Sequence, residues 1–320
     1  MTRSLSTVFA ASLALAAIAS AQSATPPNHG PDAAQFVTSD IPNFWRVFDH
    51  ATLQNASSLL QTEYIDPGSV GLHDFLQSRI QNGRALAATV AARPRYYAAI
   101  RENTLAVDRD PAIKQAIRAS FHRLKEIYPD ATFPNVYFVI GRMNSAGTVS
   151  SHGLLIGVEM NARDDNTPVD ELNAWESAVT GRAANLPHIV AHELIHIQEP
   201  DEKPKPTLLE AAIREGAADF LGELISGAII NNAQRTYGDA HEQVLWEEFK
   251  KAMTGADVSN WLFQGDRSQG RPADLGYYIG YRICEAYYRR TPDKQAAVAH
   301  ILRMSDAPAF LAESGYTGAH

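Results

Sequence analysis

The chain has 320 residues, of which 45% are apolar and 20% are charged, so it is long enough for one large domain or two lobes around a buried core. Its formal net charge of -8 argues against the basic surface that binds nucleic acid or an anionic membrane. The one cysteine, Cys284, excludes an intramolecular disulfide and a cysteine-based zinc site, so histidines and carboxylates would have to hold any metal.

The first residues have the features of an export signal. Arg3 gives a positive start, residues 8–18 are apolar and rich in alanine, and Ala19-Ser20-Ala21 is a small-residue cleavage site. We therefore expect a signal peptide at residues 1–21, and a bacterial protein that is periplasmic or secreted. The apolar stretch is too short to span a bilayer comfortably, and we expect no membrane span in the mature chain.

A leader rich in proline, alanine, asparagine and glycine follows at residues 22–37, where we expect disorder. One domain is expected to occupy residues 38–320. Its first lobe, residues 38–200, begins with segments in which apolar residues recur at a spacing of three and four. These segments predict helices at residues 72–80, 84–92, 96–103 and 111–127.

The pattern then changes to two β-rich runs, at residues 135–141 and 153–159. A polar turn rich in glycine and serine, residues 144–151, separates them, so we expect a hairpin or two neighbouring strands. Thr167 and Pro168 then predict the start of a short helix that reaches about residue 178.

Two further helices follow, one before and one after a charged loop that is rich in proline. Asn185 is expected to cap a helix that runs to Glu199, where Pro200 ends it. Thr207 and Glu210 form a capping box, which predicts a second helix that ends near Gly227. The rest of the second lobe, residues 201–320, is expected to be helical as well. The segments expected to form its helices are residues 240–253, 275–290 and 293–304.

The first of these two helices contains His192-Glu193-Leu194-Ile195-His196. Histidines four residues apart lie on the same helix face, where both imidazoles can bind one metal ion. Glu193 is rotated by about 100° from His192, so its carboxylate lies beside the metal and can take a proton from a bound water. This arrangement is the basis of the HExxH motif of metalloproteases, although two histidines of this kind can also be ordinary core or surface residues.

The second helix offers the third ligand that an open catalytic zinc site needs. Glu215 follows His196 after eighteen intervening residues, on the far side of a loop long enough to turn the chain back. Asp219 lies one turn further along and is expected to accept the free ring N–H of His192. The small residues around the two acids would allow close packing of the helices. The sequence therefore predicts one Zn²⁺ per chain, held by His192, His196 and Glu215.

These residues resemble a known group of enzymes. HExxH followed by a glutamate within Glu215-Gly-Ala-Ala-Asp219 resembles the gluzincin clan of metallopeptidases, and more closely the bacterial predicted Zn-dependent protease family (domain of unknown function 2268), which is related to the gliding-motility lipoprotein B group. Further resemblance lies in residues 41–45 and 274–282, and it covers residues 38–316. It implies an α+β, mostly helical, zincin-like fold with a small mixed sheet beside the HExxH helix and an all-helical C-terminal lobe.

Members of this clan also use a tyrosine or histidine to stabilise the oxyanion, and in aminopeptidase N-like enzymes a tyrosine lies about sixty residues after the glutamate ligand. Tyr277, Tyr278 and Tyr281 fall in that window. We favour Tyr278 and then Tyr281, although a helix rich in tyrosine and glycine also fits tight packing alone. Glu159 weakly resembles the aminopeptidase residue that binds a substrate N-terminus. Residues 153–158 resemble the strand that pairs with the substrate backbone.

Together, these features predict a zinc peptidase in which Glu193 is the general base for the hydrolysis of a peptide or protein substrate. The sequence leaves two alternatives open. One is a zinc-binding envelope protein on a peptidase scaffold without hydrolytic activity, against which the retained Glu193 argues. The other is a zinc hydrolase of a non-peptide substrate. Endopeptidase and aminopeptidase activity also remain open.

Overall fold

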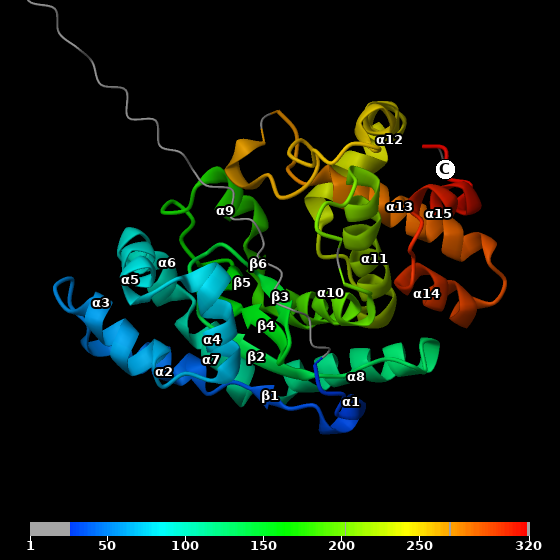
Figure 1. Cartoon of the computed structure of the whole chain (residues 1–320). Helices are drawn as coiled ribbons and strands as arrows, with labels where there is room; N and C mark the ends of the chain where they lie inside the picture. The colour runs from blue at the N-terminus through cyan, green and yellow to red at the C-terminus, as the bar shows by residue number, and fades with distance from the viewer. Residues whose placement is uncertain (1–25, 202, 269, 319–320) are drawn as a thin grey trace, which may run out of the picture.

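The computed structural model describes residues 26–201, 203–268 and 270–318, and the signal peptide expected at residues 1–21 lies outside them. The described residues are mostly helical with a small mixed sheet, so the predicted α+β class is confirmed (Figure 1). The helices before the sheet are α1 (Gly30–Ala33), α2 (Asp40–His50), α3 (Ala56–Leu59), α4 (Val70–Phe75), α5 (Gly83–Ala92), α6 (Pro94–Ala99), α7 (Arg101–Arg109) and α8 (Pro111–Ile127), with π-helical segments η1 (Leu60–Ile65) and η2 (Leu76–Ile80).

The main sheet has four strands in the order β1-β2-β4-β3. Its strands are β1 (Phe36–Val37), β2 (Asn135–Val139), β3 (Gly147–Ser150) and β4 (Gly153–Gly157). Strand β2 runs parallel to β1 and β4, with Tyr137 opposite Leu155, whereas β3 is antiparallel to β4 and forms an edge. The central strands β2 and β4 are almost completely buried, as expected for strands covered on both faces.

The two predicted β-rich runs therefore do form neighbouring strands, β2 and β4. Strand β3 was not predicted, because it lies in the polar segment that we interpreted as a turn. A second small sheet, β5 (Asn161–Arg163) and β6 (Gly181–Arg182), follows, with the 3-10 segments η3 (Val158–Met160) and η4 (Ala183–Asn185). Helix α9 (Ala174–Val179) begins at Asn173, whose side chain forms a capping box with Glu176, so the predicted start at Thr167 is wrong.

The expected disorder of residues 22–37 is also wrong for the described part of that segment. Helix α1 precedes strand β1, which pairs with β2 through Phe36 and Val37. The guanidinium of Arg118 stacks over the Phe36 ring at 4.3 Å, and the backbone N–H of His29 donates to Phe133. Two β-forming side chains and a free edge on β2 are enough to order this segment.

Helix α10 (Leu186–Gln198) lies against β3 and β4 on one side and against α11 (Leu208–Ser226) on the other (Figure 1). Asn185 does not cap α10 through its side chain, because it belongs to the preceding 3-10 turn. The capping box of Thr207 and Glu210 is confirmed, and so is the left-handed Gly227 that ends α11. The loop between the helices turns the chain back, so the two helices are neighbours.

The remaining helices form the C-terminal part of the described chain. They are α12 (Asn232–Ala252), α13 (Leu275–Arg290), α14 (Lys294–Leu302) and α15 (Ala307–Ser314), with the 3-10 turn η5 (Gly265–Arg267). Helix α13 crosses α11 so closely that Gly216 and Gly280 lie backbone to backbone, and a Cβ at either position would overlap the other helix. Two glycines at one crossing therefore let α13 approach the helix that contains Glu215.

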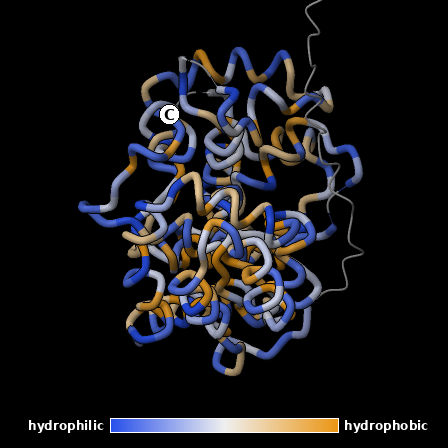
Figure 2. The backbone as a smooth tube through the Cα atoms, turned by 90° about the vertical axis from the view of Figure 1, so that its left-hand side faces the viewer, coloured by the Kyte–Doolittle hydropathy of each residue, from blue (hydrophilic) through white to orange (hydrophobic). Residues whose placement is uncertain are grey.

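Hydrophobic residues gather in the interior between these elements, and hydrophilic residues lie mainly at the margin (Figure 2). The core includes large aromatic side chains from α2, α4 and α6 that are completely buried, among them Trp45, Phe75 and Tyr96. Within the part of the chain that the structure describes, no helix has the length and apolar character needed to cross a membrane.

Candidate metal centre

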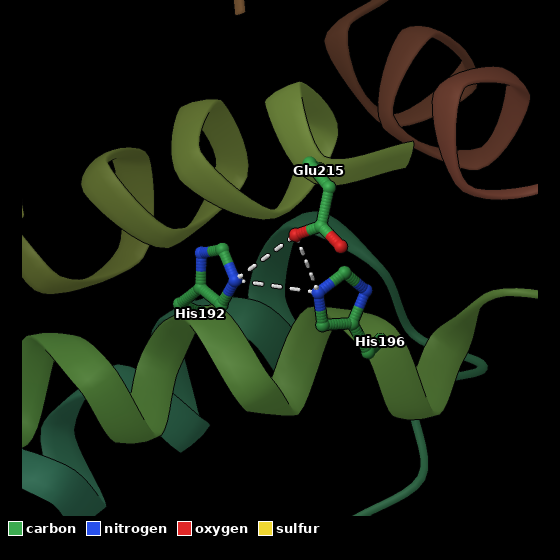
Figure 3. A group of neighbouring side chains, drawn as sticks. All are labelled: His192, His196 and Glu215. Carbon is green, nitrogen blue, oxygen red and sulfur yellow. Dashed lines mark hydrogen bonds and ion pairs between the residues drawn. The ribbon is translucent and has the colours of Figure 1, made fainter. Parts of the chain in front are cut away.

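His192 and His196 extend from the same face of α10, and Glu215 reaches towards them from α11 (Figure 3). The two Nε2 atoms are 3.3 Å apart. Glu215 Oε2 is 3.7 Å from Nε2 of His192 and 3.4 Å from Nε2 of His196. Among the described residues, these three form the only group of histidine, cysteine and acidic side chains that could hold a metal ion.

Each histidine is oriented by a carboxylate on its other ring nitrogen. His192 Nδ1 donates to Asp219 at 2.9 Å, and the second oxygen of Asp219 accepts from the Asn231 amide at 2.7 Å. His196 Nδ1 donates to Glu199 at 2.8 Å. Carboxylates that accept from ligand histidines are typical of metal sites, where they fix the ring and increase its basicity.

The carboxylate of Glu199 is itself held by Arg214. Arg214 Nη1 lies 3.2 Å from Glu199 Oε2 and donates to the backbone oxygen of Pro200 at 2.9 Å. The Glu199 side chain is only 5% exposed. Glu199 therefore has a fixed position at the end of α10, between a histidine on its own helix and an arginine on α11.

These hydrogen bonds decide which nitrogens face each other. A carboxylate accepts hydrogen bonds, so each Nδ1 carries the proton and each neutral ring presents a lone pair on Nε2. Two nitrogen lone pairs and a carboxylate oxygen within 3.3–3.7 Å of one another repel unless a cation lies between them. Ligand atoms about 2.0–2.1 Å from a tetrahedral zinc are themselves about 3.3 Å apart. The donor set and its spacing therefore fit zinc.

Without a cation, protons would have to reduce this repulsion. Burial alone would lower the pKa of His196, but the charges of Glu199 and Glu215 outweigh it and raise that pKa to about 9. The pKa of His192 is raised as well, because Asp219 and Glu215 outweigh its burial. Burial would raise the pKa of Glu215, yet the two imidazoles lower it. The site thus favours positive charge between these three side chains.

Glu193 lies next to this centre with its carboxylate unpaired among the described residues. Its side chain has no hydrogen bond and no ion pair there, and the residue is 8% exposed. Burial raises the pKa of Glu193, while the two histidines lower it. Gly147 of β3 lies directly against the carboxylate, so a Cβ at that position would be 2.5 Å from Oε1. Glu193 is therefore positioned and free to accept a proton.

The tyrosines are arranged differently from our expectation. The Tyr278 hydroxyl donates to Asp239 at 3.1 Å, and the Tyr281 hydroxyl donates to Glu223 at 2.7 Å, so both have partners outside the metal centre. Tyr277 is the tyrosine beside the site, because its ring stacks on His192 with centroids 6.3 Å apart. Burial and the charge of Glu215 raise the pKa of Tyr277, so its hydroxyl remains a proton donor at neutral pH.

Two weaker expectations are corrected as well. Glu159 is completely buried, and its carboxylate accepts the backbone N–H groups of Gly141 and Met143, so it is not available to a substrate amine. The strand at residues 153–158 is internal, with β2 and β3 on its two sides, and has no free edge. The edge strand beside α10 is β3.

Two residues of the centre, Glu199 and Asn231, were missed at the level of sequence, and a third, Tyr277, was named but not favoured. Glu199 could have been found, because it lies three residues after His196, directly after the last residue of α10. Tyr277 was in the window that we considered, but the sequence does not show which tyrosine of the window faces His192. Asn231 comes from the connection between α11 and α12, where no pattern indicates it.

Comparison with known families agrees with the resemblance. Residues 170–307, which include α10, α11 and α13, match the model of the family described as predicted Zn-dependent protease (DUF2268). The chain is thus related to that family through the segment that builds the metal centre. The suspected family is confirmed by this match. Neither the comparison with curated proteins nor the comparison with solved structures gives a match.

Proposed function

We propose that this protein is a zinc-dependent peptidase of zincin-like fold, exported from a bacterial cell, and that Glu193 is its general base. One observation carries the proposal. Two imidazole nitrogens and a carboxylate oxygen converge at zinc-ligand spacing, next to a glutamate that has no hydrogen-bond or ion-pair partner among the described residues. A structural zinc site is usually closed by four protein ligands, whereas three ligands leave a position open for water or substrate.

His192, His196 and Glu215 would hold the zinc ion, which when bound would polarise a substrate carbonyl and make water more acidic. Glu193 takes the proton from the attacking water and passes it to the leaving amine nitrogen. The Tyr277 hydroxyl donates a hydrogen bond to the carbonyl oxygen as negative charge develops on it. Asp219 and Glu199 keep the two imidazoles in the required tautomer.

The test combines metal content with peptide hydrolysis. We expect about one zinc per mature chain, measured by atomic absorption, and loss of the zinc in His196→Ala and Glu215→Ala. The zinc-loaded protein should cleave casein or members of a peptide library. Internal cuts would indicate an endopeptidase, and cuts confined to the first residues an aminopeptidase. Zinc without cleavage of any peptide would favour a non-proteolytic zinc protein or a hydrolase of another substrate, and absence of zinc would refute the proposal.

A further inference from the structure

The backbone of Arg79 is connected to the segment that contacts Glu193, although more than a hundred residues separate the two in sequence. Arg79 belongs to η2, and its backbone oxygen accepts a hydrogen bond from the Asn144 side chain at 3.0 Å. Asn144 lies in the segment that leads into β3, three residues before Gly147, which contacts the Glu193 carboxylate. This contact fastens the π-helical segment beside the proposed base.

The guanidinium of Arg79 has no acidic partner within the part of the chain that the structure describes. No carboxylate there lies within 4.0 Å of it. Its Nε is buried and has no hydrogen-bond partner. A buried N–H without an acceptor is unfavourable, and a ligand that accepts a hydrogen bond would remove that cost. The charge also acts at the proposed site, because it lowers the pKa of Glu193 against the effect of burial.

The backbone around Arg79 has an unusual conformation. Residues 76–80 form a π-helix, and Gln81 directly after it has a φ of 72°. Both conformations are uncommon, and a positive φ is unfavourable for a residue other than glycine. Conformations of this kind persist where neighbouring contacts enforce them, and they are frequent at functional sites.

We propose that Arg79 binds a carboxylate of the substrate, so that the protein prefers peptides with an acidic side chain or a free C-terminal carboxylate close to the scissile bond. The planar guanidinium suits a carboxylate because it can donate two parallel hydrogen bonds. Glu193, whose carboxylate is not a zinc ligand, would repel such a substrate. Arg79 therefore decides whether acidic peptides are accepted. This inference rests on the proposed peptidase function.

Pairs of matched peptides test whether Arg79 binds a substrate carboxylate. One series has blocked termini and carries Glu or Gln at each position around the scissile bond, and a second compares a free C-terminal carboxylate with the amide. We expect kcat/KM to favour the carboxylate member of at least one series by about 10- to 100-fold, mainly through KM. Arg79→Gln should abolish that preference, and Arg79→Lys should keep part of it. If only the first series shows a preference, the group that Arg79 binds is an acidic side chain. If only the second series shows one, the group is the C-terminal carboxylate.

The exposed Arg84 of α5 gives the control, because Arg84→Gln removes the same charge and should keep the wild-type preference. The inference is overturned if wild type does not distinguish the members of either series, or if Arg79→Gln slows both members equally. Fluorescence anisotropy of labelled peptides separates this result from failure of the proposed function. If wild type cleaves nothing, tighter binding of carboxylate peptides that Arg79→Gln loses still supports the role of Arg79, and equal or absent binding refutes it.

Discussion

The two sides of the metal centre are built in different ways. On one side, α10 and α11 supply both histidines, Glu193, Glu215 and Asp219 from one short stretch of sequence. On the other side, β3 supplies a glycine against Glu193, and the start of α13 supplies Tyr277 against His192. In the proposed enzyme, the helix pair would hold the metal and the base, whereas the opposing segments would shape what reaches them. Substitutions on the two sides should therefore affect different measurements.

The largest effect is expected at the base on the helix pair. Glu193→Gln removes the proton acceptor and keeps its shape, so kcat should fall by about 10²- to 10⁴-fold while one zinc per chain remains. Peptide hydrolysis and atomic absorption measure the two quantities. The exposed Glu247 of α12 is a suitable control, since Glu247→Gln should change neither. Hydrolysis by Glu193→Gln at the wild-type rate would remove Glu193 from the mechanism.

The opposing side is tested by the tyrosines of α13. Tyr277→Phe should lower kcat by about 10²- to 10³-fold and leave zinc content unchanged, because it removes one oxyanion donor. Tyr278→Phe is the matched control, since its hydroxyl is bonded to Asp239. We expect Tyr278→Phe to have nearly wild-type kcat. If Tyr278→Phe lowered kcat and Tyr277→Phe did not, Tyr278 would be the oxyanion donor, as favoured from the sequence, and Tyr277 would only pack against His192.

The effect on metal affinity should be smaller and confined to the helix pair. Asp219→Ala and Glu199→Ala each remove the acceptor that orients one histidine, so each should weaken zinc binding by about 10- to 100-fold. Competition with a chromogenic chelator measures the affinity. Tyr277→Phe should leave it unchanged. If Glu199→Ala bound zinc as tightly as wild type, the contact with His196 would have no role in metal binding.

This difference also explains how much could be predicted from the sequence. The ligands, the base and Asp219 follow from helix periodicity, because residues three or four apart lie on one face and a capping box places the second helix. Helices α8 and α13 were predicted with their observed bounds, since each has a regular apolar face, and Asp110 caps α8 through its side chain. Local rules were sufficient for these elements.

The other side depends on contacts between distant segments. Strand β3 has a polar, glycine-containing sequence, and it becomes a strand because β4 offers hydrogen bonds along its length. Strand β1 is formed in the same way beside β2. Tyr277 cannot be distinguished from Tyr278 by helix spacing, because the choice depends on where α13 crosses α11 at Gly216 and Gly280. No short-range pattern contains that information.

An effect of a different kind is expected on stability, at the buried carboxyl group of Glu159, which accepts two backbone N–H groups from the chain before β3. Burial raises the pKa of Glu159 from 4.5 to about 7. Between these values the unfolded chain is ionised while the folded protein keeps the proton. The contribution of Glu159 to stability is therefore complete below pH 4.5, and about 3 kcal/mol is lost as the pH rises to about 7.

Glu159→Gln cannot ionise, so this pH-dependent loss should be absent from the variant. One backbone N–H, of Gly141 or Met143, would lose its acceptor, which adds a penalty that does not vary with pH. The signature is thus a difference in unfolding free energy between wild type and variant that favours wild type more at pH 5 than at pH 8. Urea unfolding followed by circular dichroism measures it, with Glu247→Gln as the exposed control. An equal difference at both pH values would mean that Glu159 is already ionised in the folded protein, and that the segment before β3 is held by a charged group.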